Sequence, residues 1–212
     1  GGIDLSVGAV MFLAPLIAGY AMRHLGLPVP AGFLVAIGTG VVLGAINAFF
    51  IARLRVIPFI VTLATLFLFR GAEFWLTSST QFDFSDDMRA FGLSRIAGIP
   101  MPIVVFALIA LAAHILLSQT AFGRQVYAFG NDPEAARKAG VKVGWVQARV
   151  YIICSTCAAI SGFVLIAQIG RLDVAFGEGR EFDVIAAAVL GGASLFGGVG
   201  SAFGAVVGAT LI

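Results

Sequence analysis

The residues that could carry chemistry in this sequence are few, and two of them are oppositely charged neighbours within an apolar stretch. Arg70 and Glu73 are three positions apart, so on a helix they share one face and can form an ion pair. Ionisable residues within a membrane span normally face the protein interior and mark a functional site. Two interpretations stay open: a neutralising structural pair, or a gate along a solute path.

One four-residue pattern resembles a catalytic motif. Gly192-Ala193-Ser194-Leu195 has the G-x-S-x form of intramembrane serine proteases. Such a serine needs a histidine base within hydrogen-bond reach, and no histidine follows Ser194 in this sequence. We therefore predict no catalytic residue and keep an intramembrane serine protease only as a third alternative.

Cysteine and histidine also give no sign of a metal site. Cys154 and Cys157 form a C-x-x-C pattern inside an apolar run, and they are the only cysteines in the sequence. Free cysteine packs as a small apolar residue. His24 and His114 each lack a second ligand at metal-binding spacing. The sequence predicts no metal site and no cofactor in this chain.

The composition places these residues in a membrane protein. Of 212 residues, 60% are hydrophobic and 11% are charged, and the mean hydropathy is +1.04. Soluble domains usually carry about 25% charged residues, so this chain has too few charges for a water-exposed surface. The net charge of +2 and the scattered basic residues exclude a nucleic-acid-binding surface.

The apolar runs predict an all-α, polytopic membrane protein. A membrane helix needs about 20 mainly apolar residues. The six candidate spans are 5–22, 24–52, 57–77, 96–123, 150–170 and 184–212. We expect the helices of the second and fourth runs to begin after Pro30 and Pro102. The last run is glycine-rich, and we expect it to be broken or re-entrant. The sequence lacks an initial Met and stops within an apolar run, so we expect truncation at both ends.

The connections between the spans differ in charge. One side carries seven basic residues against two acids: Arg53, Arg55, Arg124, Arg137, Lys138, Lys142 and Arg149 against Asp132 and Glu134. The other side carries five basic residues against seven acids: Arg23, Arg89, Arg95, Arg171 and Arg180 against Asp83, Asp86, Asp87, Asp173, Glu178, Glu181 and Asp183. Because a basic excess marks the cytoplasmic side, we predict that loop 123–149 is cytoplasmic and loop 78–100 extracytoplasmic.

The cytoplasmic loop contains the signals of one short helix, predicted over 133–139. Asp132 suits the N-cap and Pro133 the first helical position. Glu134 complements the positive end of the helix dipole. Gly140 suits the left-handed position after the helix. A helix of about two turns is marginal alone in water, so it packs either on its own bundle or on a partner.

This loop also carries a family resemblance. Glu134-Ala135-Ala136 followed by Gly140 resembles the E-A-A…G coupling segment of ABC importer permeases, and 122–131 resembles the loop of ribose-, xylose- and galactoside-type sugar permeases. Further similar stretches are 1–8, 59–71 and 181–198, so the likeness covers the whole chain. It implies one permease domain over 1–212, from a longer protein of roughly ten spans. The implied ATPase-coupling residues are Asn131, Asp132, Pro133, Glu134, Ala135, Ala136, Arg137, Lys138 and Gly140.

The resemblance implies a set of partners in the bacterial plasma (inner) membrane. They are a second permease chain, identical or different, cytoplasmic ATP-binding subunits, and an extracytoplasmic sugar-binding protein. The sequence contains no G-x-x-x-x-G-K-[ST] phosphate loop, so ATP and Mg would be bound by the partner ATPase subunits. The other transport alternative is an ion-coupled secondary transporter, which needs its own intramembrane coupling site.

Two further sets of residues are assigned from the sequence. Polar groups within spans must bond to another helix, to backbone or to a water-filled cavity. The candidate pathway residues are Asp4, Asn47, Thr62, Thr65, Arg70 and Glu73. The glycines expected to break helices or to allow close packing are Gly1, Gly2, Gly8, Gly191, Gly192, Gly197 and Gly198.

Overall fold

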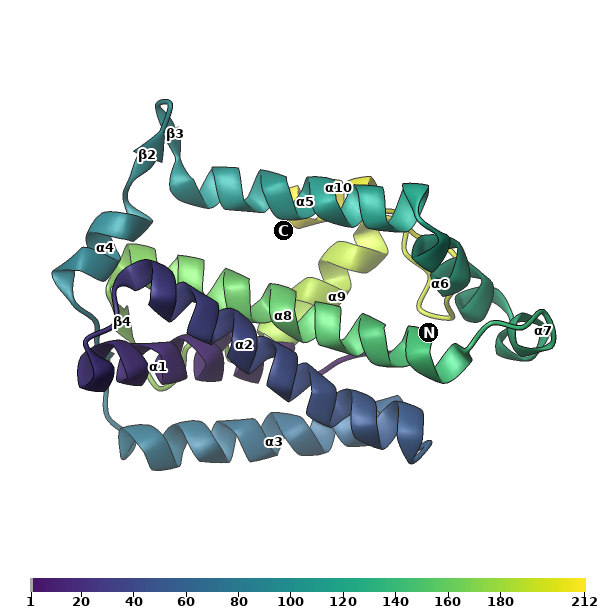
Figure 1. Cartoon of the computed structure of the whole chain (residues 1–212), viewed down its shortest axis with the longest axis horizontal. Helices are drawn as coiled ribbons and strands as arrows, with labels where there is room; N and C mark the ends of the chain where they lie inside the picture. Colours follow the sequence, from purple (N-terminus) through teal and green to yellow (C-terminus); the bar gives the residue numbers. More distant parts are fainter. Residues whose placement is uncertain (1) are drawn as a thin grey trace.

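Five long helices form the body of the computed structural model, which describes residues 2–212 (Figure 1). Gly1, one of the predicted helix-break glycines, lies outside the described residues. The helices long and apolar enough to cross a membrane are α1 (Val7–Leu25), α2 (Val29–Ala48) continued by the π-helical turn η1 (Phe49–Arg53), α3 (Pro58–Thr77), α5 (Met101–Gln119) and α8 (Val143–Ile169). They confirm the prediction of a helical, polytopic membrane protein.

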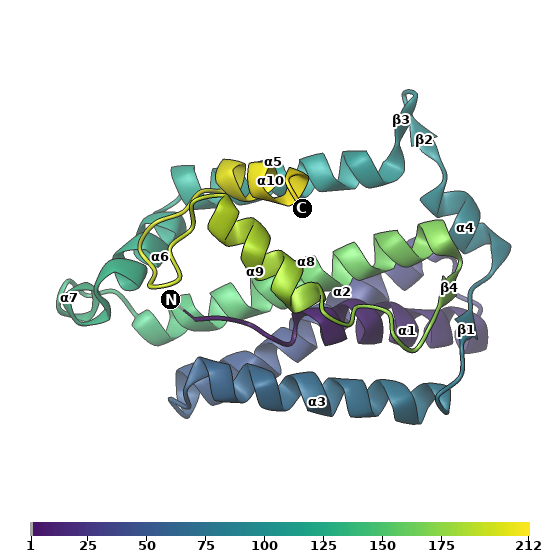
Figure 2. The same ribbon diagram turned by 180° about the vertical axis from the view of Figure 1, so that it is seen from behind.

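The sixth predicted span is broken, as its glycine content indicated. It forms two short helices, α9 (Arg180–Leu190) and α10 (Ala202–Thr210), joined by the glycine-rich loop 191–201. Figure 2 shows α9 crossing α8 obliquely, with the loop extending toward the α6 end of the molecule. A Cβ on Gly208 would collide with the carbonyl of Ala187, so α10 packs backbone to backbone on α9.

The predicted cytoplasmic loop 123–149 is mostly helical. It contains most of α6 (Ala121–Asn131), all of α7 (Pro133–Lys138) and the first two turns of α8. Arg149 lies on the second turn of α8 and Lys142 is the N-cap residue of that helix, and both are exposed. Similarly, Pro30 and Pro102 lie in the first turn of α2 and α5 rather than before it, where the missing N–H costs nothing.

The centre of the bundle is α1, which packs against α2, α3 and α8. Phe12 of α1 and Phe163 of α8 are 1% and 0% exposed. Small residues permit the close approach: a Cβ on Gly162 would collide with the backbone of Met11, and one on Gly44 would lie 2.7 Å from the Cα of Ile152. Since lipid supplies no hydrophobic drive between helices, this dense packing is what holds the bundle together.

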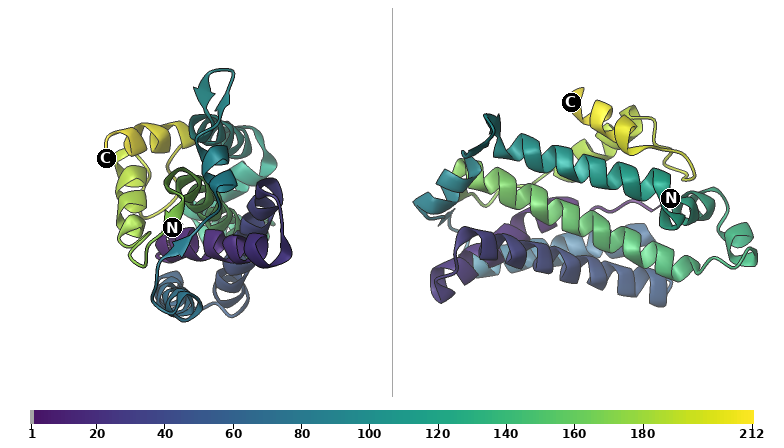
Figure 3. Two further views of the ribbon diagram at one scale, coloured as in Figure 1. Left: turned by 90° about the vertical axis from the view of Figure 1, so that its left-hand side faces the viewer. Right: turned by 45° about the horizontal axis from the view of Figure 1, so that its top comes forward.

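The end of the bundle opposite α7 carries a small cap, built mainly from loop 78–100. Strand β1 (Phe82–Asp83) pairs antiparallel with β4 (Arg171–Leu172), and α4 (Asp86–Gly92) follows. Strands β2 (Arg95–Ile96) and β3 (Ile99–Pro100) form a hairpin that projects beyond α4 and α5 (Figure 3). The cap and α7 therefore lie at opposite ends of the long axis.

Candidate functional site

The short helix α7 has the caps that the sequence indicated. The Asp132 carboxylate accepts hydrogen bonds from the backbone N–H groups of Glu134 and Ala135, at 2.8 and 3.0 Å. The helix ends at Lys138, one residue before the predicted end, because Ala139 is already its C-cap. Gly140 follows at φ +86°, a conformation that costs glycine nothing.

Most of α7 is exposed. Ala136 is its only buried residue, and the Lys138–Glu134 ion pair of 3.1 Å is 77% and 74% exposed. The helix contacts α6 and the start of α8 and extends past the end of the bundle (Figure 1). The predicted coupling residues from Asn131 to Gly140 therefore lie in α7 and in the residues directly before and after it, and all of them except Ala136 are exposed.

Helix α6 connects α7 to the loop that breaks the last span. The Tyr127 hydroxyl donates a 2.8 Å hydrogen bond to the carbonyl of Gly200. A Cβ on Gly198 would lie 3.0 Å from the Cα of Asn131, so the two backbones are in close contact. Neither α6 as a separate element nor this contact was predicted from the sequence. Helix α6 thus contacts both α7 and loop 191–201.

Four of the six predicted pathway residues converge on the segment before α1. Asp4 accepts from the Ser6 hydroxyl at 2.6 Å, and Ser6 accepts from Asn47 at 2.9 Å. Thr65 donates to Asn47 at 2.7 Å, while Thr62 donates to the carbonyl of Ile3. This network joins the N-terminal segment to α2 and α3. Ser6, which the sequence analysis missed, is fully buried at its centre.

A cavity of about 220 Å³ adjoins this network. The N-terminal segment 2–7, α8, α9 and residues 193–195 line it. Asp4 is the predicted pathway residue that borders it, whereas Asn47, Thr62 and Thr65 are at most 5% exposed and lie in the network. One carboxylate oxygen of Asp4 and the hydroxyl of Tyr151 have no hydrogen-bond partner among residues 2–212. Both atoms are buried, so they lie behind the lining of the cavity.

Arg70 and Glu73 form the expected ion pair, and Arg70 has a second partner. Its Nη1 lies 3.0 Å from Glu73 Oε2 and donates a 2.8 Å hydrogen bond to the carbonyl of Phe176. The pair is almost enclosed, with side chains 14% and 3% exposed. It therefore fastens α3 to the segment that enters α9. Glu181, assigned from the sequence to an exposed connection, is instead 7% exposed in the first turn of α9.

The predicted glycines serve two structural purposes. Gly2, Gly8 and Gly191 allow close packing, since a Cβ would collide with Tyr151, Gly177 or Gly204 respectively. Three others shape loop 191–201 at positive φ: Gly192, Gly197 and Gly198.

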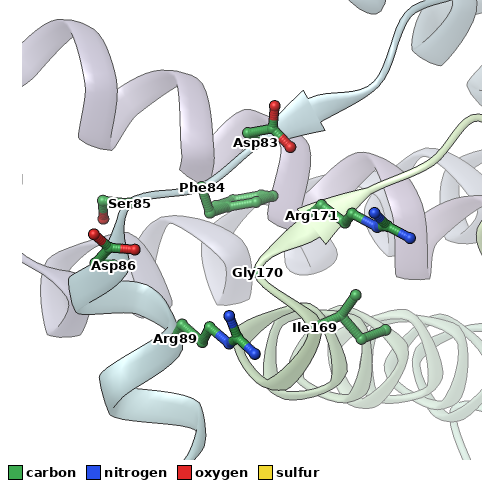
Figure 4. A pocket seen from close by; sticks show the side chains of 8 residues that line it. All are labelled: Asp83, Phe84, Ser85, Asp86, Arg89, Ile169, Gly170 and Arg171. Carbon is green, nitrogen blue, oxygen red and sulfur yellow. The ribbon is translucent and has the colours of Figure 1, made fainter.

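A second cavity, of about 450 Å³, lies in the cap at the opposite end (Figure 4). Asp83, Asp86, Arg89 and Arg171 surround the turn at Gly170, where α8 ends. Figure 4 shows Asp83 and Asp86 toward the upper left and Arg89 and Arg171 toward the lower right. This arrangement provides a polar surface with both charge signs.

The residues that resembled catalytic or metal-binding motifs do not form a common site in the described part of the chain. Within the part of the chain that the structure describes, no three His, Cys, Asp or Glu side chains gather as metal ligands. Cys154 and Cys157 are unpaired thiols, partly enclosed in α8. The Ser194 hydroxyl accepts from the backbone N–H of Phe196.

A helical membrane bundle with a broken last span and an exposed, capped helix defines a multi-pass membrane permease. Residues 1–212 match the family described as the permease component of branched-chain amino acid transport systems, and the chain belongs to that family.

Several curated relatives are similar over the whole chain. The ribose import permease protein RbsC of Escherichia coli is 35% identical across 100% of this chain and 67% of its own length. The fructose import permease protein FrcC of Rhizobium meliloti is 36% identical across 100% and 61%. The xylose transport system permease protein XylH of Haemophilus influenzae is 32% identical across 99% and 72%. The chain spans about two thirds of these relatives' length. No solved structure matches it.

Proposed function

We propose that this chain is the transmembrane pathway subunit of an ATP-driven importer of a sugar. The observation that carries the proposal is α7, a capped and exposed helix at the end of the bundle that bears the basic excess. Its exposure supports docking to a partner, since it contacts its own chain only through α6 and the start of α8. The partners are cytoplasmic ATPase subunits, which bind ATP and Mg. This chain is a transporter subunit without enzymatic activity of its own.

The proposed mechanism passes motion along the chain from α7 to the solute path. An ATPase subunit that changes shape displaces α7, and α6 transmits the displacement through Tyr127 and Gly200 to loop 191–201. Residues 193–195 of this loop border the 220 Å³ cavity. The motion therefore changes the wall of the cavity and opens it toward the buried, unpartnered oxygens of Asp4 and Tyr151. A low affinity of this cavity for the solute suits an importer, because the solute must also leave the cavity.

The solute is proposed from the relatives. Those with 32–36% identity are named for ribose, fructose, xylose and D-allose, all of them monosaccharides. A cavity with a carboxylate and a phenol can satisfy hydroxyl groups, which act both as donors and as acceptors. An extracytoplasmic sugar-binding protein delivers the solute to the cap, and a second permease chain completes the pathway.

The coupling role is tested by charge reversal on α7 in the assembled transporter. Glu134→Lys with Arg137→Glu, or Ala136→Pro, should abolish co-purification of the ATPase and sugar-stimulated ATP turnover while leaving membrane insertion intact. The matched control for co-purification is Arg171→Glu with Asp173→Lys, which should retain the ATPase because that pair is also exposed but lies in the cap, at the opposite end of the molecule. Unchanged ATP turnover in both α7 variants would refute the docking role.

The nature of the solute is tested by uptake into vesicles that contain the complete transporter. Ribose, fructose, xylose and allose are compared with leucine, because the family description refers to branched-chain amino acids. Uptake of leucine in preference to all four sugars would contradict the proposal. Uptake without ATPase subunits would instead support the ion-coupled alternative, for which Glu73 and Glu181 are the buried carboxylates.

A further inference from the structure

A cavity of about 910 Å³ lies near α7, at the basic end of the bundle. Its walls are the last turns of α2, the π-helical turn η1, the connection after α7 and the first turns of α8. It is separate from the cavity at Asp4. Both cavities are lined in part by α8, but they have no lining residue in common. Irregular π-helical turns occur often at functional sites, and η1 supplies both Phe49 and Arg53 to the wall.

The charged part of this cavity is entirely basic. Arg53, Arg55, Arg137 and Lys142 line it, and no acidic residue does. Among the described residues none of these four cations belongs to an ion pair. The carboxylate of α7 does not compensate them, because Glu134 is already paired with Lys138. Four unneutralised cations around one opening favour an anionic ligand.

The remainder of the cavity is apolar and extends into the spans. Phe49, Trp145 and Ile152 line it, together with Ala45 and Ala48. Ala45 precedes Arg53 by eight residues, which on a helix is about 12 Å. The aromatic residues are exposed at its mouth, Trp145 by 66% and Phe49 by 53%. A ligand that fills the site must therefore be charged at one end and hydrocarbon at the other.

We propose that this cavity binds an anionic phospholipid, with the phosphate among the four cations and the first methylene groups against Phe49 and Ile152. Basic pockets between transmembrane helices commonly bind anionic headgroups. Free phosphate would use the cations but not the apolar wall. An acidic segment of an ATPase subunit would have to enter between spans as deep as Ala45. Because Arg137 lies in the last turn of α7 and Lys142 follows the helix, the bound lipid would stabilise the connection between α7 and α8.

The proposal is tested by native mass spectrometry of the intact transporter in detergent, titrated with phosphatidylglycerol or phosphatidylcholine. Phosphatidylglycerol should be retained at lower concentration, and Arg53→Gln with Arg55→Gln should weaken its retention by about tenfold. The matched control is Arg124→Gln with Arg149→Gln, two basic residues of the same end that do not line the cavity; it should retain the lipid. A third variant, Ala45→Phe, narrows the apolar wall without changing charge and should also weaken retention.

Three results would overturn the proposal. One is equal retention of the two lipids by the unmodified transporter. Another is competition of inorganic phosphate with phosphatidylglycerol without any effect of Ala45→Phe, which would identify a free-anion site. The third is loss of the ATPase subunit from the Arg53/Arg55 variant with lipid retention unchanged, which would identify an ATPase contact. None of these readouts depends on the identity of the transported solute.

Discussion

The hydroxyl of Tyr127 donates a 2.8 Å hydrogen bond to the carbonyl of Gly200 and so joins the helix before α7 to the loop that interrupts the last span. Tyr127→Phe removes only this bond. A hydrogen bond contributes about 0.5–1.5 kcal/mol, so we expect sugar-stimulated ATP turnover to fall several-fold while the ATPase still co-purifies. Tyr20→Phe is the control, since Tyr20 also donates to a carbonyl, that of Leu76 between α1 and α3. Equal losses in both variants would contradict a specific coupling role.

Tyr151 lines the cavity beside Asp4, and its hydroxyl is buried without a hydrogen-bond partner among residues 2–212. Tyr151→Phe deletes this hydroxyl and no hydrogen bond within the described chain, so the thermal midpoint of the purified transporter should stay unchanged. If the hydroxyl contacts the passing solute, uptake should slow by about two- to tenfold, the equivalent of one hydrogen bond. Initial rates of sugar uptake measure this effect. An initial uptake rate of the variant equal to that of the wild type would show that Tyr151 does not contact the solute.

Arg70 holds both the Glu73 carboxylate and the carbonyl of Phe176. Removing one partner of a buried ion pair costs about 3–5 kcal/mol because the other charge stays uncompensated. Arg70→Met should therefore lower the thermal midpoint strongly, and adding Glu73→Met should restore most of it.

Transport by that double variant separates the two interpretations of the pair. If uptake returns with stability, Arg70 and Glu73 are a structural connection between α3 and the segment before α9. If stability returns without uptake, the charges themselves take part in gating. If the single variant Arg70→Met has the thermal midpoint of the wild type, both interpretations are contradicted.

The glycines of α2 and α8 differ in what surrounds them. A Cβ on Gly162 would collide with the backbone of Met11, whereas one on Gly38 meets nothing within 4 Å. Gly162→Ala should separate α8 from α1 and greatly reduce the amount of folded protein. Gly38→Ala should be neutral or stabilising by up to about 1 kcal/mol, since alanine favours the helix. Size-exclusion profiles and thermal midpoints compare the pair; equal behaviour would refute this packing.

The sequence predicted those features that depend on residues close together in the chain. The apolar runs predict the spans because length and hydropathy are local properties, and the glycines of 191–201 predict the break in the last one. The N-cap of α7 was equally predictable, because Asp132 reaches N–H groups only two and three residues away.

The contacts between distant segments were not predictable in this way. Asp4, Asn47 and Thr65 were each recognisable as polar groups within or beside spans, but their connection through Ser6 joins residues up to 41 positions apart. Arg70 and Phe176 are separated by 106 positions, and Tyr127 and Gly200 by 73. Glu181 was assigned to a connection because it precedes the last apolar run, 184–212. The one available signal was its position near the start of a helical pattern, which does not reveal which face is enclosed.

Helices α1 and α5 differ in opposite ways in their mean hydropathy and in the share of residues that is buried. Helix α1 is the least hydropathic of the five candidate spans and 67% buried, whereas α5 is the most hydropathic and only 6% buried. During synthesis, α5 can therefore leave the insertion machinery into lipid by itself. Helix α1 is made before α8, on which it packs and which follows more than 100 residues later. Until α8 has been synthesised, the weakly hydropathic α1 therefore needs another contact, from a chaperone, from the insertion channel or from another segment of the chain.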